Sequence, residues 1–262
     1  MSLLVPISLD MATFPSEIQE FISGSRLFDS SCSANARVTF IDKDQGFFLK
    51  TSAKGSLLPE AEMTRFFHSK GLAAEVVTYI SGESDWLLTR CIYGEDCTSP
   101  AILAQPERLC DLLAEYLLLL HSTNYNGCPI MDHTKHSLAR AEDNYRTGKY
   151  DQAFFPDKWG YASAEEAWKV IETEGHLLKT DSLLHGDYCL PNIILNNWSL
   201  SGFVDLGNGG VGDIHEDVFD VLKSLERNLK TNRYRERFIY AYGKSKVNED
   251  TLRLIAALGL FW

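Results

Sequence analysis

Four polar side chains in the second half of the chain have the types and spacing that phosphoryl transfer requires. His185, Asp187 and Asn192 lie on one short polar stretch, and Asp205 follows further along. An Asp held by its loop can accept the proton of an attacking hydroxyl, while an Asn and a second Asp hold a metal ion against phosphate oxygens. Mg²⁺ prefers hard oxygen ligands and keeps several waters, so two protein ligands and a nucleotide suffice for it.

Short apolar runs surround these residues and predict the elements that position them. Leu183-Leu184 and Ile193-Ile194-Leu195 flank the polar stretch, which indicates a strand, a loop and a second strand. A third run, residues 202–206, carries Asp205 near its end and is followed by Gly207. Each polar residue alone is also a common turn or loop residue, so the interpretation depends on their joint spacing.

This joint spacing also resembles a known family. His185-Gly186-Asp187-x4-Asn192 with Asp205-Leu206-Gly207 is similar to the catalytic core of the aminoglycoside phosphotransferases, which are relatives of the protein kinases. Protein kinases usually carry Arg at the position of Gly186 and Phe at that of Leu206, so the small-molecule branch fits better. The resemblance implies that Asp187 is the catalytic base and that Asn192 and Asp205 bind Mg²⁺. The phosphate donor would be ATP or GTP, and the sequence does not distinguish the two.

The fold that the resemblance implies is α+β and protein-kinase-like, with two lobes. Residues 1–96 would form a small antiparallel-sheet lobe that binds the nucleotide and includes the hinge. Residues 97–262 would form a larger, mainly helical lobe that holds the catalytic and substrate-binding residues. The cleft between the lobes would hold the nucleotide.

The first half of the chain contains the expected nucleotide-binding residues. Residues 46–50 predict a strand that ends on Lys50, and the family carries a similar lysine that binds the α- and β-phosphates. A helix over residues 59–68 offers Glu60 and Glu62 as carboxylates to orient this lysine, and Glu60 matches the family's register better. The loop of small residues around Ser33 can bring backbone N–H groups close to phosphates.

Two further positions follow from the resemblance at the hinge and three in the substrate pocket. In the family the hinge binds the base through backbone groups, which places Arg90 and Ile92 there by position alone. Carboxylates receive the ammonium groups of the sugar, and here the candidates are Asp157, Glu226 and the terminal carboxylate of Trp262. Family members commonly end in an acidic pair before hydrophobic residues, whereas this sequence has residues 258–262 without acids.

Composition excludes several other classes. The net charge of −11 argues against a nucleic-acid partner and suits a cationic small molecule. The 6 cysteines show no metal-ligand spacing and indicate reduced thiols, and no apolar run approaches membrane-spanning length. Composition thus predicts a cytoplasmic protein without a nucleic-acid or membrane partner. The resemblance implies that it binds an aminoglycoside and a nucleotide, and we expect a monomer.

Two alternatives remain open at this stage. The acceptor could be another small hydroxyl compound, such as a macrolide, choline or a sugar. The chain could also be a degenerate kinase fold that binds a nucleotide or drug without turnover, although the joint presence of Lys50, Asp187, Asn192 and Asp205 argues against it. The expected function is phosphorylation of an aminoglycoside antibiotic, which would confer resistance.

Overall fold

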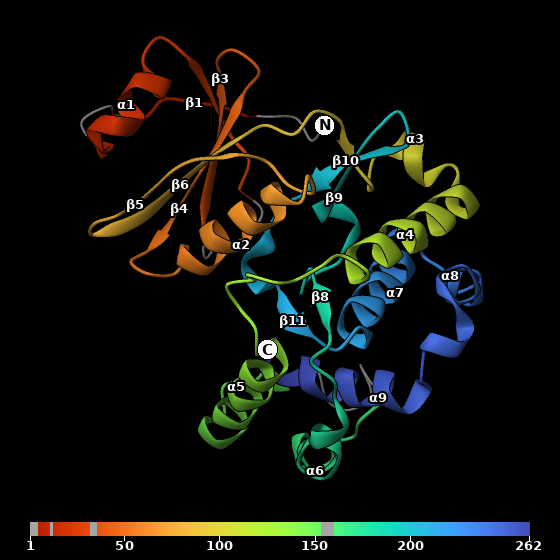
Figure 1. The fold of residues 1–262 in the computed structure, drawn as a ribbon. Helices are drawn as coiled ribbons and strands as arrows, with labels where there is room; N and C mark the ends of the chain where they lie inside the picture. The colour runs from red at the N-terminus through yellow and green to blue at the C-terminus, as the bar shows by residue number, and fades with distance from the viewer. Residues whose placement is uncertain (1–4, 11–12, 32–35, 153–159) are drawn as a thin grey trace. The chain divides into compact units, whose positions relative to one another are not determined.

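The structure is a computed structural model that describes residues 5–10, 13–31, 36–152 and 160–262. Contacts divide the chain into two compact units (Figure 1). Unit 1 comprises Met1–Ser99 and Pro191–Asn208, and unit 2 comprises Pro100–Leu190 and Gly209–Trp262. The contacts thus group residues 191–208 with the first unit, while the boundary that we predict near residue 96 stays a prediction.

An antiparallel sheet dominates unit 1. In the described part of the chain it has 6 strands in the order β1-β2-β3-β4-β6-β5. Its strands are β1 (Val5–Ile7), β2 (Arg26–Asp29), β3 (Arg37–Asp42), β4 (Phe47–Ala53), β5 (Val76–Ser81) and β6 (Ser84–Arg90). The sequence predicts a hairpin of residues 74–80 and 85–89 closed by residues 81–84, and the structure forms this hairpin from β5 and β6.

Two helices cover the two faces of this sheet. Helix α1 (Ser16–Ile22) packs Ile18 and Ile22 onto an apolar cluster that includes Leu49 and Leu88. Helix α2 (Leu58–Ser69) packs Ala61 against Leu87, which points to the opposite face because side chains alternate along a strand. Figure 1 shows α1 in red and α2 in orange, each next to strands of this sheet. The sequence predicts a helix over residues 14–23 with Ser16 as its cap; the helix is confirmed, but Ser16 is its first residue.

The turn before α2 is fixed by a buried carboxylate on β6. Asp85 is 0% exposed and accepts hydrogen bonds from the Leu57 backbone N–H, the Tyr79 hydroxyl and the Ser81 hydroxyl. Although burial raises its pKa, these hydrogen bonds more than offset that effect and lower the pKa of Asp85 to about 2. Asp85 therefore ties the β5–β6 hairpin to the start of α2.

The remaining elements of unit 1 include a second small sheet. It has 3 strands in the described chain, in the order β10-β9-β7. They are β7 (Glu95–Asp96), β9 (Ile193–Asn196) and β10 (Ser199–Phe203), and the 3₁₀ turn η5 (Leu206–Asn208) follows β10. The predicted strands at residues 193–195 and 202–206 correspond to β9 and β10, but β10 ends at Phe203, before Asp205.

Helices make up most of unit 2. The longer ones are α4 (Pro106–His121), α5 (His133–Thr147), α6 (Ala164–Glu174), α7 (His215–Leu229), α8 (Arg235–Tyr242) and α9 (Glu249–Leu258). Shorter elements are α3 (Pro100–Leu103), η3 (Gly175–Leu177), β8 (Ser182–Leu184), β11 (Gly210–Gly212), η6 (Lys244–Lys246) and η7 (Gly259–Phe261). The 3₁₀ turn η4 (Leu190–Asn192) lies at the junction of the two units in the sequence.

Helical spacing of leucines explains the core of unit 2. Along α4, Leu109, Leu113, Leu117 and Leu120 are all 0% exposed, at intervals of three or four residues. Figure 1 shows α7 running beside α4, and their contact places α7 next to this apolar face. The predicted α+β fold is confirmed, with the antiparallel sheet in the N-terminal unit and the helices in the other.

The sequence predicts helices that start with a capping box at Ser163, with Asn232 and with Asn248; the first and third are correct and the second is wrong. The Ser163 hydroxyl accepts the Glu166 N–H, as expected for a capping box, and the Asn248 side chain accepts the N–H groups of Asp250 and Thr251. Asn232 does not cap α8, because that helix begins three residues later. No helix among the described residues is long and apolar enough to cross a membrane.

Candidate active site

The Lys50 ammonium pairs with two carboxylates in unit 1. Its Nζ lies 2.6 Å from Glu60 Oε2 and 2.8 Å from Asp205 Oδ1. The Lys50 and Glu60 side chains are 21% and 12% exposed, whereas the Asp205 side chain is 54% exposed and open to a ligand. The structure therefore brings together three of the residues that the sequence singles out.

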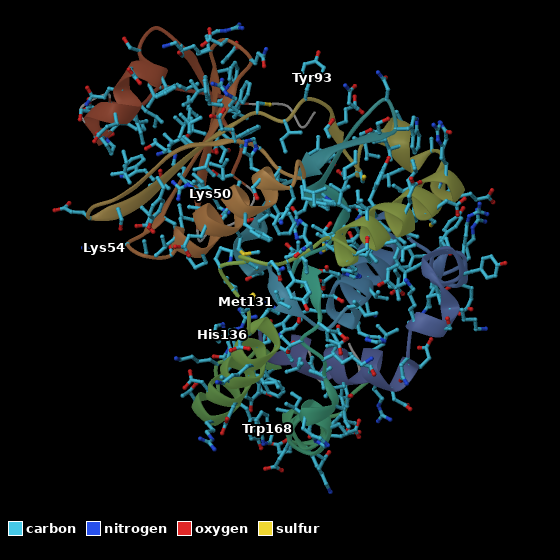
Figure 2. All side chains as sticks on the ribbon, viewed as in Figure 1. Lys50, Lys54, Tyr93, Met131, His136 and Trp168 are labelled. Carbon is cyan, nitrogen blue, oxygen red and sulfur yellow. The ribbon has the colours of Figure 1, made fainter. Side chains whose placement is uncertain are left out.

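Strand alternation and one helix turn explain how Lys50 meets Glu60. Phe47 and Leu49 of β4 point into the cluster beneath α1, so Lys50 points to the opposite face, where it is paired in register with Leu87. That face is the one covered by α2, whose first turn carries Glu60. Figure 2 labels Lys50 on β4. The strand continues to Ala53, so the prediction that it ends on the lysine is wrong.

The hairpin of β9 and β10 brings Asn192 and Asp205 to one end. Ile193 is the register partner of Phe203, and one residue further out the Asn192 carbonyl accepts the Val204 N–H at 3.0 Å. Asn192 is 9% exposed. Antiparallel pairing thus fixes an amide oxygen and a carboxylate at the same end of the hairpin, and both are hard ligands.

The backbone around Asp205 is held in an uncommon conformation close to α2. Asp205 has a φ of 60°, in the left-handed region that Asp tolerates better than most residues. A Cβ added at Gly207 would lie 3.4 Å from the Glu60 Cβ, so the turn after Asp205 lies in direct contact with the helix that carries Glu60. Such conformations persist where the surroundings fix them, often at functional sites.

The charges in this group influence one another. Burial lowers the pKa of Lys50, but the charges of Glu60 and Asp205 outweigh it and raise the pKa of the ammonium above its ordinary value. For Glu60, burial raises the pKa, the Lys50 charge opposes this, and Asp205 adds to the increase. Lys50 therefore remains a cation between its two partners.

In unit 2, the loop with the sequence His-Gly-Asp follows β8 and is held by α7. Gly186 has a φ of 75°, which a residue with a Cβ rarely adopts, and this explains a glycine before Asp187. The backbone N–H groups of His185 and Gly186 donate to Asp217, at 2.9 and 2.8 Å. The Asp187 carboxylate accepts a hydrogen bond from the Cys189 thiol.

Asp217 belongs to a buried hydrogen-bonded chain within unit 2. His121 Nε2 lies 3.0 Å from Asp217 Oδ2, and His121 Nδ1 lies 2.7 Å from the Tyr242 hydroxyl. Burial acts to raise the pKa of Asp217, but the hydrogen bond and charge of His121 outweigh it and the pKa is lowered. The sequence predicts that Asp213 and Asp217 tie the metal loop to the following helix. Asp213 accepts the N–H of His215 at the start of α7, whereas Asp217 binds the loop that carries Asp187.

His121 and Tyr242 are positions that sequence reasoning did not connect to the site. The sequence marks His121 only as a histidine at the end of a leucine-rich helix, and nothing in the local pattern links it to residues about one hundred positions away. A polar residue at the end of a leucine-rich helix is the available signal, because a polar group that becomes buried there needs a partner.

The other nucleotide-site candidates are less informative in the structure. The Arg90 guanidinium donates from Nε to Glu75 Oε2 at 2.7 Å and lies over the Phe47 ring, and its backbone N–H donates to the Glu75 carbonyl. Ile92 lies just after β6, and its side chain packs against Gly202: a Cβ added there would lie 2.9 Å from the Ile92 Cδ1. Ser33 lies outside the described residues. The structure thus does not bring Arg90 or Ile92 to the Lys50 group.

Of the substrate candidates, the structure describes Glu226 and Trp262 but not Asp157, which lies outside the described residues. Glu226 lines a cavity of about 260 Å³ between α7, α8 and α9, and its carboxylate lies 3.6 Å from the Lys223 ammonium. The Trp262 ring lies beneath the Arg140 guanidinium. Trp168, labelled in Figure 2, stacks on Tyr145 with ring centroids 4.9 Å apart.

A partly buried ion pair between a sheet lysine and a helix glutamate, and an Asp-bearing loop held by a helix, are the features of a kinase-like phosphotransferase. The family model for the phosphotransferase enzyme family matches residues 28–255. A relative from Lactococcus lactis subsp. lactis, named probable aminoglycoside 3'-phosphotransferase, is 40% identical over 262 residues and covers 100% of both chains. The chain therefore belongs to the phosphotransferase enzyme family, and the resemblance to aminoglycoside phosphotransferases is confirmed.

More distant relatives agree with this assignment. The aminoglycoside 3'-phosphotransferase of Niallia circulans is 28% identical over 209 residues, which are 79% of each chain. The crystal structure of an aminoglycoside-3'-phosphotransferase of type VIII superposes with a TM-score of 0.73 at 23% identity, covering 91% of this chain and 94% of the other. A phosphotransferase from Streptomyces rimosus, in complex with ADP and streptomycin, has a TM-score of 0.72 at 19% identity over 86% and 90% of the two chains. These structures show the fold.

Proposed function

We propose that this phosphotransferase moves the γ-phosphate of ATP or GTP to a hydroxyl of an aminoglycoside, with Mg²⁺, and so confers resistance to the antibiotic. The Lys50–Glu60–Asp205 group is the observation that carries the reaction class, because it holds a cation beside an exposed carboxylate of the kind that binds Mg²⁺. The substrate class rests on the 40% identity to the Lactococcus lactis relative along the whole chain.

Lys50 is the group that holds the nucleotide phosphates in this proposal. Its ammonium is already oriented by Glu60 at 2.6 Å, so little side-chain freedom is lost when a phosphate oxygen binds. Asp205 is the more exposed of its two partners, at 54%. The Lys50–Asp205 contact is therefore the one that an arriving phosphate group can replace.

Asn192 and Asp205 are the residues that would hold Mg²⁺. Both offer oxygen atoms, they lie at one end of the β9–β10 hairpin, and oxygen is the donor that this ion prefers. The described residues contain no cluster of three or more His, Cys, Asp and Glu side chains that would bind a metal by themselves. The ion would neutralise charge on the phosphate oxygens, with nucleotide and water as its remaining ligands.

Asp187 is the proposed catalytic base. Its loop is anchored by two hydrogen bonds from backbone N–H groups to Asp217, so the carboxylate occupies a fixed place on unit 2. The substrate hydroxyl would donate its proton to Asp187 as its oxygen attacks the γ-phosphorus, and the bond between that phosphorus and the bridging oxygen breaks. The nucleoside diphosphate leaves with the electron pair of this bond.

An aminoglycoside carries several ammonium groups, and carboxylates would receive them. Glu226, Asp157 and the terminal carboxylate of Trp262 stay candidates for this role, as Arg90, Ile92 and Ser33 do for the nucleotide. The net charge of −11 favours attraction of a polycation. A monomeric state and a cytoplasmic location likewise stay predictions.

Turnover measurements test the proposal. Nucleotide consumption is followed with Mg²⁺ and either ATP or GTP, in the presence and absence of kanamycin. We expect phosphate transfer that depends on kanamycin. Nucleotide binding without transfer to kanamycin would contradict the aminoglycoside assignment and direct the search to other hydroxyl acceptors.

A further inference from the structure

The start of α5 is docked on the ribbon that β8 and β11 form. The Val211 N–H of β11 donates to the Ile130 carbonyl, and the Thr134 hydroxyl of α5 donates to the Lys179 carbonyl just before β8, both at 2.8 Å. β11 is paired in register with β8, and the loop that carries Asp187 follows β8. Figure 1 shows β8 and β11 next to each other. The position of α5 is therefore set against the strands that lead to the proposed base.

His133, the first residue of α5, fills a slot in this ribbon. A Cβ added at Gly210 would lie 2.8 Å from the His133 Cβ, and one added at Gly212 would lie 3.2 Å from the His133 Cδ2. Side chains at these two positions would thus occupy the space that the imidazole fills. Because His133 is only 7% exposed, its polar ring needs a partner inside the protein.

Glu216, in the first turn of α7, is that partner. Its Oε1 lies 2.6 Å from His133 Nε2, and Glu216 is 3% exposed. The Ser137 hydroxyl lies 3.1 Å from the same nitrogen. Since a carboxylate only accepts hydrogen bonds, Nε2 carries a proton in both states of the ring, and Nδ1 is the atom that gains or loses the second proton. Protonation of Nδ1 therefore converts a buried hydrogen bond into a buried ion pair.

The charges that face His133 favour its protonated form. Burial acts to lower the pKa of the imidazole, but the hydrogen bond and charge of Glu216 and the charge of Asp217, both on α7, outweigh burial. Arg140 on α5 opposes them, and the residues of β11, Gly-Val-Gly, cannot titrate. The pKa of His133 is raised above its ordinary value of 6.5. The ion pair therefore persists at pH values at which an exposed histidine is neutral.

We propose that His133 and Glu216 form a proton-dependent latch that fixes the start of α5 on the β8–β11 ribbon and loosens this contact when the ring is deprotonated. Because the pKa of His133 is higher in the folded chain than in the unfolded chain, the stabilisation is fully present below 6.5 and is lost as pH rises through the folded-state pKa. The Nε2–H still donates to Glu216 after this loss, so α5 loosens without detaching.

Amide hydrogen exchange at several pH values tests the latch. The amides of residues 136–141 lie in the first turns of α5, and the His136 N–H donates to the Asp132 carbonyl at 3.1 Å. Their protection factors, which divide out the intrinsic pH dependence of exchange, should fall by about tenfold as the wild-type His133 ring is deprotonated. NMR titration of this ring follows the deprotonation directly. Amides of β6, in unit 1, are the internal reference and should keep their protection.

Glu216→Gln separates the charge of the latch from its shape, because it keeps the size and an acceptor oxygen. Below pH 6.5 we expect its α5 protection factors to be about tenfold lower than in the wild type, without the fall at higher pH. The His133 ring should also lose its proton at a lower pH than in the wild type. His136→Gln, on the exposed side of α5 and labelled in Figure 2, is the matched control and should keep the wild-type pH dependence.

Three results would overturn the inference: wild-type α5 protection that is constant across the His133 titration, the same fall with pH in Glu216→Gln, or a His133 ring that loses its proton at or below the ordinary pKa of 6.5. If Glu216→Gln fails to fold, the wild-type exchange and ring titration still decide the matter. None of these measurements needs nucleotide or kanamycin, so failure of the proposed function appears separately, as absence of kanamycin-dependent turnover.

Discussion

Lys50 and Asp205 are 155 positions apart in the sequence, and their side chains meet at 2.8 Å. The contact joins the main sheet of unit 1 to the turn after the β9–β10 hairpin, so the lysine that we propose for phosphate and the carboxylate that we propose for metal lie within one group. Glu60 completes it from α2 at 2.6 Å. The reaction class follows from this proximity more directly than from any one of the three residues.

Replacement of Lys50 by Met should reduce kcat/KM for the nucleotide by about 10²–10³, because a fixed cation at the phosphates is lost. The chain should still fold, although Glu60 and Asp205 then face each other without the ammonium between them. Steady-state kinetics and a thermal melt would measure both effects.

Lys54 provides the matched control for this change. It lies on the exposed turn after β4 and is labelled in Figure 2. Lys54→Met should leave kcat/KM within about twofold of wild type, as for most surface substitutions. Equal losses in the two variants would show that the effect comes from net charge and not from the Lys50 group.

Removal of Mg²⁺ should abolish turnover, and its return should restore it. Asp205→Asn should raise the Mg²⁺ concentration needed for half-maximal activity by about 10- to 100-fold or more. Changes next to metal ligands have effects of this size, and a change of a ligand itself should not be smaller. The reason is that Asn supplies a neutral oxygen where the wild type has a carboxylate. A metal titration of kcat measures this, and an unchanged Mg²⁺ requirement would remove Asp205 from the metal site.

Asp85 predicts an acid-dependent loss of stability. Its folded-state pKa of about 2 lies below the ordinary value of 3.8, so its contribution is present above the ordinary pKa and is lost as pH falls through about 2. Asp85→Asn should lower the free energy of unfolding by about 1–3 kcal/mol at neutral pH, because buried donors lose a charged acceptor.

Urea unfolding at several pH values measures the Asp85 effect. The difference between wild type and Asp85→Asn should shrink as pH falls from neutral towards 2, the pKa at which the carboxylate becomes protonated. Glu83→Gln, on the exposed turn of the same hairpin, is the control. A difference that stays constant with pH would mean that the charge of Asp85 contributes nothing.

Asp217→Asn should affect both stability and turnover. The carboxylate accepts from two backbone N–H groups and from His121, and an amide has only one oxygen for them. We expect a loss of about 3 kcal/mol in unfolding free energy, as for the removal of one partner from a buried charged network. We also expect kcat to fall by about 100-fold, because the loop of Asp187 is displaced. Asp181→Asn, which is exposed, should change neither; equal kcat in both variants would contradict the anchoring role.

The sequence alone predicted the elements that have strong local patterns. Alternation along residues 46–50 predicts that Lys50 faces away from Phe47 and Leu49, as it does. The leucine spacing predicts a helix over residues 106–121, and α4 has these bounds. These predictions succeed because strand alternation and helical periodicity depend on neighbouring residues. The resemblance of the His-Gly-Asp motif added the fold class, which the structure and the comparisons confirm.

Long-range contacts could not be predicted in the same way. Several contacts join segments that lie far apart in the sequence, and the local pattern does not predict that these segments meet. They are the Lys50–Asp205 contact, the hydrogen bond from Leu57 to Asp85, and the chain from Tyr242 through His121 to Asp217. Asn232 was predicted wrongly as a helix start because capping preference is weak compared with tertiary packing. Buried polar residues are therefore where the sequence is least informative and the structure most informative.

The most direct test of the central claim is turnover by the Asp187→Asn enzyme with kanamycin, Mg²⁺ and ATP or GTP, alongside its nucleotide affinity. The substitution keeps the size of the side chain and removes the base. We predict that kcat falls by about 10²–10⁴, the usual contribution of a positioned base, while the nucleotide Kd stays at the wild-type value. Wild-type kcat in this variant would contradict the assignment of Asp187 and with it the proposed mechanism.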